Sequence, residues 1–328
     1  MNSKKLSLWL LDYGIVLILF IMIGIFSIAS SNFFSFGTLT TILRQVSITG
    51  IISVGAAFVI LTAGIDLSVG SIACISSLTC ALCLKAGISI PLAILITLAI
   101  AVCYGIFSGC LVSFFKMSPL IATLGMMTSL RGAGYLITDG LPVYGFGSGL
   151  SPFGRGFILG IPYPVILMVF VFALGIFILT YTPIGRHVYG VGGNEEASRL
   201  SGVNVTAVKI FCYGFCAFLS GVAGLVLLSR TNSGQPAAGV GYEMDAITAV
   251  VLGGISLMGG QGKLALVIVG VLIMGVLSTG MLMCNINDYV QQVVKGLVLI
   301  AAVAFSYVSL RMRDKIISQA DKAEAAAA

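Results

Sequence analysis

The sequence predicts an all-α, polytopic membrane protein with about ten transmembrane helices. Hydrophobic residues make up 59% of the 328 residues, charged residues make up only 9%, and the mean hydropathy is +1.13. Soluble domains carry roughly 25% charged residues, and so low a charge content also excludes a disordered chain. Apolar stretches recur along nearly the whole chain, which leaves little room for a separate soluble domain.

Ten apolar stretches, each bounded by turn residues or charges, give the predicted helices in chain order. A helix of roughly 20 apolar residues crosses the hydrocarbon core of a bilayer. The predicted helices cover residues 11–29, 46–63, 68–84, 91–115, 119–138, 162–180, 209–229, 245–258, 264–283 and 289–310.

The first and the eighth stretches need separate justification. The first follows Lys4 and Lys5 and resembles a signal peptide, but equally hydrophobic segments follow it, which favours an uncleaved helix. The stretch 245–258 is too short to span squarely. It is either broken or re-entrant and continues through the glycines as far as residue 263, and the sequence leaves open whether it spans.

The positions of Lys and Arg predict the orientation of these helices. Arg44, Lys85, Arg155 and Arg230 fall on the side opposite the N-terminus, Arg131 and Lys295 fall within helices, and the other Lys and Arg residues fall on the N-terminal side. Cytoplasmic loops of membrane proteins are enriched in Lys and Arg. Both termini are therefore expected in the cytoplasm, and the loops at 139–161 and 230–244 are expected outside.

The domain organisation follows from this topology. Residues 1–315 are predicted to form a single transmembrane domain, with a long cytoplasmic loop at 181–208. Residues 316–328 are predicted to be a polar, Ala-rich cytoplasmic tail, and their alanine repeat is typical of a solvated tail or of an artificial extension.

The loop at 181–208 contains a short predicted helix of about two turns. Asn194 is placed as its N-cap, Glu195 and Glu196 lie at the positive end of the helix dipole, and Gly202 is placed at its C-terminal cap. Glu195 and Arg199 have the i, i+4 spacing of a stabilising ion pair. The chemistry alone leaves two interpretations open, an inert surface turn or a knob that binds a cytoplasmic partner.

Three stretches carry a family resemblance. They are residues 62–71 (TAGIDLSVGS), 192–203 (GGNEEASRLSGV) and 249–260 (AVVLGGISLMGG). They closely resemble the permease subunits of bacterial ribose-type monosaccharide ABC importers. Weaker similarity at residues 31–34, 121–124 and 235–243 extends the resemblance over residues 30–310, roughly.

The resemblance implies the partners and the location of the chain. In this family two permease chains, alike or paired with a sister chain, assemble with cytoplasmic ATPase subunits that bind ATP and Mg and with an external, periplasmic or surface, sugar-binding protein that selects the sugar. No cofactor is expected on this chain, and the expected location is the lipid bilayer of the bacterial cytoplasmic (inner) membrane. The short helix would be the ATPase-coupling helix, with the coupling residues Gly193, Asn194, Glu195, Glu196, Ala197, Ser198, Arg199, Leu200 and Ser201.

An internal similarity links two interrupted segments. Residues 64–70 and 254–260 share the pattern G-I-x-L-x-x-G, and each follows an apolar helix predicted to run inward. Paired interruptions in corresponding halves are typical of transporters. The structural motif residues are Gly64, Asp66, Gly70, Gly254 and Gly260.

Asp66 has a structural and a functional interpretation. Its structural role is either the N-cap of the third predicted helix or a carboxylate stabilised by the dipole of that helix, and a proton or cation relay is the functional alternative. The structural role is favoured because the topology places Asp66 at the cytoplasmic rim of the membrane, where an ionised carboxylate is stable.

Several polar residues fall within or beside the predicted helices. Arg131 and Lys295 are expected to pair or to extend toward the membrane surface, since a charge at the bilayer centre costs at least ~2.5–3.5 kcal/mol. A hydrated translocation path is the alternative for these polar residues, and helix–helix hydrogen bonds explain the neutral ones equally well. The candidate path residues are Thr123, Thr128, Arg131, Asn285, Gln291 and Gln292, together with Asn287.

Other functions lack the residues they need. The run from Gly259 to Leu264 fails as a phosphate loop, because Leu257 stands where the first glycine belongs and Leu264 replaces the Mg-binding Ser or Thr. The eight cysteines fall in or at the ends of apolar segments, and the single His187 is far in sequence from every one of them, so buried apolar cysteines are expected rather than a metal site or disulfides. The predicted helices contain no catalytic constellation, and no nucleic-acid-binding face is evident.

With these functions lacking support, the resemblance implies a non-enzymatic permease subunit, driven by a partner ATPase, that forms the path for a ribose-like pentose or a hexose. A secondary transporter or facilitator for small polar solutes is the alternative. No Asp or Glu is placed at the membrane midplane, which argues against proton coupling but not against facilitation. The sugar, the choice between homodimer and heterodimer, and any regulation are not determined by the sequence.

Overall fold

A computed structural model describes residues 3–30 and 32–327, which form thirteen helices and one short β-hairpin. The helices are α1 (Ser3–Ala29), α2 (Phe36–Leu61), α3 (Val69–Lys85), α4 (Ile90–Ser113), α5 (Pro119–Thr138), α6 (Ser151–Arg155), α7 (Tyr163–Tyr181), α8 (Pro183–Gly193), α9 (Glu195–Leu200), α10 (Val205–Thr231), α11 (Tyr242–Leu252), α12 (Leu264–Met283) and α13 (Asp288–Ala327). Strands β1 (Phe157–Ile158) and β2 (Ile161–Pro162) pair antiparallel. The all-α prediction is confirmed.

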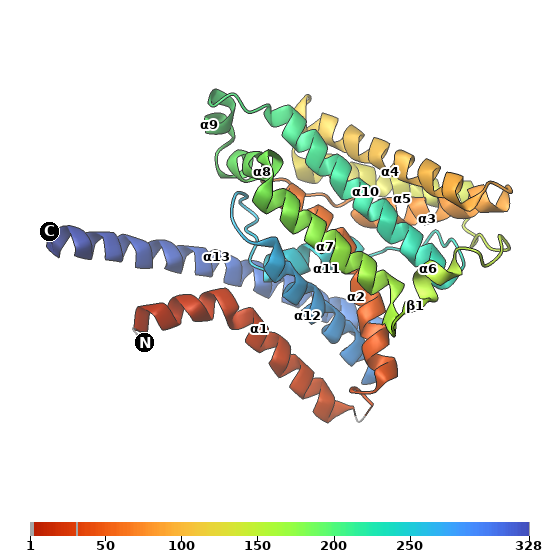
Figure 1. Ribbon diagram of the computed structural model, residues 1–328, viewed down its shortest axis with the longest axis horizontal. Helices are drawn as coiled ribbons and strands as arrows, with labels where there is room; N and C mark the ends of the chain where they lie inside the picture. The colour runs from red at the N-terminus through yellow and green to blue at the C-terminus, as the bar shows by residue number, and fades with distance from the viewer. Residues whose placement is uncertain (1–2, 31, 328) are drawn as a thin grey trace.

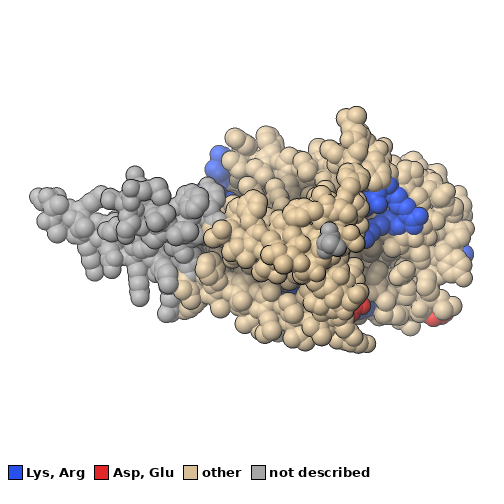
Figure 2. Space-filling model, turned by 90° about the horizontal axis from the view of Figure 1, so that it is seen from below, with Lys and Arg blue, Asp and Glu red and all other residues tan. Residues whose placement is uncertain are grey.

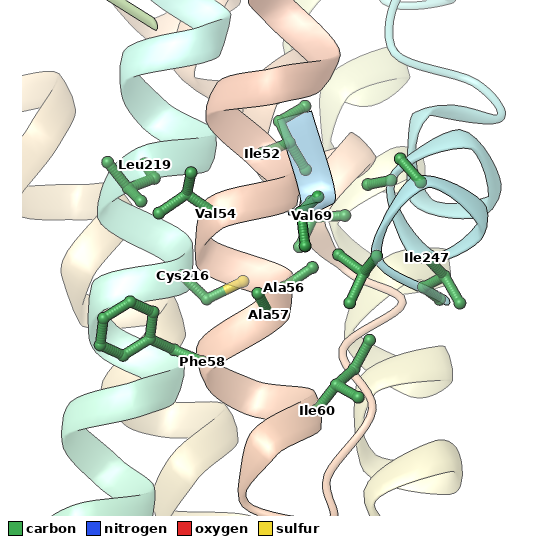
Figure 3. Close-up of a cluster of buried hydrophobic side chains, with 14 of the residues drawn as sticks. Ile52, Val54, Ala56, Ala57, Phe58, Ile60, Val69, Cys216, Leu219 and Ile247 are labelled. Atoms are coloured by element: carbon green, nitrogen blue, oxygen red, sulfur yellow. The ribbon is translucent and has the colours of Figure 1, made fainter. Parts of the chain in front are cut away.

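Helix α2 forms the centre of the molecule. Every residue from Val46 to Leu61 is buried, which is the pattern of an interior helix that is apolar on all sides. Helix α10 packs against it and also against α3 and α4, while α7, α11 and α12 cover other sides of α2 (Figure 1). Figure 3 shows the resulting core, in which Cys216 and Leu219 of α10 lie on one side of α2 and Val69 and Ile247 lie on the other.

Each of the ten predicted stretches overlaps one helix, although α2 begins at Phe36 rather than at residue 46. Within residues 14–30 and 32–308, seven helices are long and apolar enough to cross a membrane: α2, α4, α5, α7, α10, α12 and the part of α13 from Asp288 to Val308. The helices α3 and α11 are shorter than these spans, with 17 and 11 residues. The predicted count of about ten helices therefore agrees with the fold.

The stretch 245–258 is not one continuous helix. Helix α11 ends at Leu252, and residues 253–263 form an irregular connection to α12. Gly254, Gly259 and Gly260 in this connection have positive φ angles, which other residues adopt only with strain. The structure thus identifies the predicted short stretch as a broken segment.

A second irregular segment, residues 232–241, precedes α11 and lies along α3. The thiol of Cys74 in α3 donates to the carbonyl oxygen of Pro236 at 3.3 Å. At Gly239 the two backbones are so close that an added Cβ would lie 2.5 Å from the carbonyl oxygen of Gly70. The beginnings of α3 and α11 therefore meet inside the molecule.

The last helix is longer than the sequence pattern predicted. Helix α13 continues through residues 309–327, where the prediction ended the helix at 310 and placed a tail from 316. Alanine, lysine and glutamate are strong helix formers, which explains why these residues extend the helix.

Glycine permits the close crossing of α4 and α10, and this gives a prediction. An added Cβ at Gly105 would lie 2.5 Å from the carbonyl oxygen of Tyr213, whereas one at Gly214 meets only a side-chain carbon of Ile106 at 3.6 Å. We expect Gly105→Ala to destabilise the protein by roughly 1–3 kcal/mol through overpacking and Gly214→Ala to leave it as stable as the wild type. Thermal unfolding in detergent measures both, and equal stability of the two variants would contradict this packing.

Candidate functional site

Helices α8 and α9 form a unit at one end of the molecule (Figure 1). Asn194 caps α9 as predicted, because its Oδ1 accepts a hydrogen bond from the backbone N–H of Ala197 at 2.9 Å. Gly202 follows the helix with a positive φ of 85° and donates its N–H to the carbonyl oxygen of Arg199. The predicted capped helix is therefore confirmed, with six residues from Glu195 to Leu200.

Ion pairs fix α9 in place. Glu195 accepts from Arg199 at 3.0 Å, which is the predicted i, i+4 pair, and its other carboxylate oxygen lies 2.7 Å from Nζ of Lys209 on α10. The second pair spans two helices and limits the movement of α9 relative to α10. Exposed ion pairs contribute little to stability, so their main effect here is on geometry.

The predicted coupling residues form a protruding surface. Ser198 is buried and Glu195 is half-buried, whereas Gly193, Asn194, Glu196, Ala197, Arg199, Leu200 and Ser201 are exposed. The side chain of Leu200 is 87% exposed. Leu200 is thus a single exposed apolar side chain among the charged side chains of Glu196 and Arg199.

Helix α8 holds this surface against the two interrupted connections. The hydroxyl of Tyr189 donates to the carbonyl oxygen of Gly262 at 2.9 Å. Burial raises the pKa of this phenol, so it stays protonated as the donor role requires. The N–H of Gly260 donates to the carbonyl oxygen of Leu61 at 2.9 Å, which joins the connection after α11 to the end of α2.

The start of the first G-I-x-L-x-x-G segment and the end of the second therefore lie close together, although their motif residues have different roles. Gly64 lies close to the Tyr213 side chain and Gly70 close to the Glu243 carboxylate, so neither position has room for a side chain. Gly254 and Gly260 provide positive φ angles in the connection after α11.

Asp66 is placed differently from the prediction in two respects. The N-cap of α3 is Ser68, and Asp66 lies two residues earlier, where its Oδ1 accepts from the N–H and the hydroxyl of Ser68 at 2.9 and 2.6 Å. Asp66 is also only 3% exposed and does not lie at an open rim. A turn before the helix uses an Asp side chain in this way. Asp66 is therefore not the N-cap itself, and the choice between a structural role and a relay stays a prediction.

The candidate path residues on α5 have local partners. Thr123 is fully buried, and its hydroxyl donates to the carbonyl oxygens of Pro119 and, at 3.3 Å, Ile65, so it joins two segments of the fold. The hydroxyl of Thr128 bonds within its own helix. Nε of half-buried Arg131 donates to the hydroxyl of Ser71 at 3.4 Å.

The other candidate path residues lie at the turn between α12 and α13. Asn285 and Gln292 line an open cavity of about 600 Å³ with Leu282, Ile286, Asn287, Asp288 and Tyr289. Gln291 instead donates to the carbonyl oxygen of Ile286 at 2.9 Å. None of the three residues on α5 borders this cavity, so the structure separates the predicted path residues into two groups within one chain.

Charged residues of α11 were not predicted as part of a site. Glu243 is 6% exposed and accepts the N–H of Gly241 at 3.2 Å, with its other carboxylate oxygen over Gly70. Asp245 forms an ion pair of 2.7 Å with Lys295 on α13, which confirms pairing for Lys295. The only signal in the sequence was an acidic pair at the start of a short apolar segment, and it does not reveal which elements lie opposite.

The opposite end of the molecule carries the loops at 139–161 and 230–244. Val143 and Gly234 exchange two backbone hydrogen bonds, which join the loops. Arg44 donates to the carbonyl oxygen of Arg155, and Arg155 donates to that of Arg230, each at 2.8 Å. Figure 2 shows basic side chains gathered at the end that carries α6 and β1 in Figure 1.

Comparison with known proteins identifies the family. The model of a family described as "Branched-chain amino acid transport system / permease component" matches residues 38–303. This chain belongs to that permease family. No solved structure gives a significant match.

The relatives resemble the chain over nearly its whole length. The ribose import permease protein of Haemophilus influenzae is 44% identical over 92% of this chain and 95% of its own length. The ribose import permease protein of Bacillus subtilis is 46% identical, covering 87% and 89%. The L-arabinose transport system permease protein of Escherichia coli K12 is 34% identical over 90% of each chain. The resemblance stated from the sequence motifs is thus confirmed.

The ion pair between α11 and α13 gives a testable prediction. Lys295→Met leaves the 14% exposed Asp245 side chain without its partner and is expected to destabilise the protein by roughly 3–5 kcal/mol. The double variant Asp245→Asn, Lys295→Met removes both charges and is expected to regain most of that stability. Thermal unfolding in detergent tests this, and a double variant no more stable than Lys295→Met would show that the pair has no such role.

Proposed function

We propose that this chain is the membrane-spanning subunit of an ATP-driven importer for a monosaccharide, with ribose as the first substrate to test. The family description names branched-chain amino acids, but relatives matching at least 87% of the chain are named for ribose and L-arabinose. The observation that carries the ATP-driven mechanism is α9, a capped helix whose exposed face has the Leu200 side chain at its end.

The partner at α9 is proposed to be a cytoplasmic ATPase subunit, which would bind the ATP and Mg. In the orientation predicted from Lys and Arg, α8 and α9 lie on the cytoplasmic side, as do both termini, and the membrane is the bacterial cytoplasmic membrane. A groove on the ATPase would cover the Leu200 side chain. The charged side chains of Glu196 and Arg199, which are 73% and 51% exposed on α9, would lie around it at the edge of the interface. An apolar centre with a polar rim is the usual anatomy of such an interface.

An external sugar-binding protein is proposed to dock at the opposite end. The loops at 139–161 and 230–244 form one connected surface there through the Val143 and Gly234 backbone pair. The guanidinium of Arg44, 4.6 Å from the ring centre of Phe157, belongs to the basic part of this surface. Acidic side chains on the binding protein would complement it and speed docking.

A second permease chain, most simply another copy of this one, is proposed to complete the path. Helix α13 exposes Val290, Val293, Leu297 and Ile300, and little of its span is covered within one chain. The cavity at the start of α13 presents the amides of Asn285, Asn287 and Gln292 beside this face. The NH2 of a side-chain amide donates to a sugar hydroxyl, and its carbonyl oxygen accepts from one. The cavity is therefore suited to be the mouth of a path between two chains.

The substrate is tested by uptake. In cells that make this chain with its associated ATPase and binding protein, we expect radiolabelled ribose to enter at the expense of ATP. Unlabelled ribose should compete, and leucine should not. Inhibition by leucine but not by ribose, L-arabinose or allose would exclude a sugar importer, and uptake without ATP would favour a facilitator.

The role of α9 is tested by its exposed leucine. Covering a leucine side chain stabilises an interface by about 1.5–3 kcal/mol, so Leu200→Glu is expected to weaken ATPase binding at least about tenfold. The control Leu159→Glu changes a leucine that is 97% exposed at the opposite end and should retain the ATPase. Co-purification in mild detergent measures both, and full ATPase recovery with Leu200→Glu would make α9 an ordinary surface turn.

A further inference from the structure

The backbone of Gly192, near the end of α8, touches two other segments directly. A Cβ added at this position would overlap the carbonyl oxygen of Leu61 and lie 2.5 Å from the nitrogen of Gly260. Both neighbours are backbone atoms, which cannot rotate away as the end of a side chain can. The backbone angles of Gly192 are helical and would suit any residue. Glycine is therefore needed at this position because of the close contact and not because of its backbone conformation.

Three segments that are far apart in sequence meet here, and we name the meeting place of Leu61, Gly192, Gly259 and Gly260 the glycine junction. Leu61 and Gly260 share a backbone hydrogen bond of 2.9 Å. An added Cβ at Gly259 would lie 2.7 Å from the nitrogen of Ala63 and 2.9 Å from the carbonyl oxygen of Gly192. In the glycine junction the backbones of the three segments contact one another directly. No side chain lies between them that could change its conformation when one segment moves.

The junction is firmly connected to α9. The N–H of Asn194, the capping residue of α9, donates to the carbonyl oxygen of Gly190 on α8 at 3.0 Å. Tyr189, on the same helix, reaches Gly262 through its hydroxyl. A movement of α9 therefore displaces the end of α8 and, with it, the atoms that contact Leu61 and Gly260.

The junction also lies at one end of each interrupted segment. From Leu61 the chain runs through Asp66 to the start of α3, and from Gly260 it runs back to the end of α11. The starts of α3 and α11 meet in turn, where Glu243 lies over Gly70. Close-packed interiors have low compressibility and transmit displacement.

We infer that Gly192 is a positioning residue for transport: through the glycine junction it transmits movement of α9 to the interrupted segments before α3 and after α11. This inference rests on the proposed coupling of α9 to an ATPase. It assigns transmission to backbone contacts inside the chain, separate from the exposed side chains that bind the partner.

The test compares two glycines of α8 in the complete complex of permease, ATPase and binding protein. Gly192→Ala is expected to lower the number of ribose molecules transported per ATP hydrolysed by roughly tenfold, within the range for changes along a coupled route. The matched control is Gly190→Ala, whose added methyl group meets only the rotatable Ser198 hydroxyl, at 3.2 Å. The control is expected to keep the wild-type ratio, and both variants are expected to keep the ATPase bound.

A second variant adds no atoms to the junction. Tyr189→Phe removes the hydrogen bond to Gly262 and is expected to lower the same ratio about two- to fivefold with the complex intact. A wild-type ratio in assembled Gly192→Ala, or an equal fall with Gly190→Ala, would overturn the inference. If Gly192→Ala does not assemble, a wild-type ratio with Tyr189→Phe overturns it.

The proposed function has a separate readout. Ribose uptake and ATPase binding in the wild-type complex test the importer, whatever the glycine variants do. A wild-type importer that couples normally in Gly192→Ala would leave the proposed function standing and remove only the junction.

Discussion

Backbone groups that leave a helix inside a membrane protein need partners from the protein itself, and this requirement shapes the fold. The irregular segments before α3, before α11 and after α11 meet it in different ways. Leu61 and Gly260 bond to each other, Cys74 bonds to Pro236, and Asp66 bonds to Ser68. Each of these hydrogen bonds needs a second segment or a short polar side chain very close to the irregular backbone. Glycine is frequent in the irregular segments because it has no side chain to prevent so close a contact.

The same requirement separates binding from transmission. The face of α9 that a partner can reach consists of side chains such as Glu196 and Leu200, whereas the contacts behind α8 are made by backbone atoms of Gly192 and Gly260. Ser198, buried between the two, belongs to neither surface. The unit of α8 and α9 therefore presents charged and apolar side chains to the outside and only backbone contacts to the inside of the molecule.

Hydropathy was sufficient to predict the longer helices, and cap chemistry was sufficient to predict α9 from Asn194 to Gly202. Both depend on neighbours in sequence. The environment of Asp66 was mispredicted because its burial depends on α10 and on other remote elements. The partners of Lys295 and Thr123 lie 50 and 58 residues away, so no local pattern identifies them. The predicted path residues fell into two groups for the same reason.

The separation between the exposed side chains of α9 and the backbone contacts of α8 has an evolutionary consequence. If α9 binds an ATPase as proposed, substitutions on its exposed face would change which ATPase is bound without disturbing an interior contact. The glycines behind it tolerate no such drift, because any side chain at Gly192 would meet backbone atoms. On that proposal, duplicated permeases would diverge in the ATPase they bind through a few surface substitutions on α9, while the backbone contacts at Gly192 stay the same.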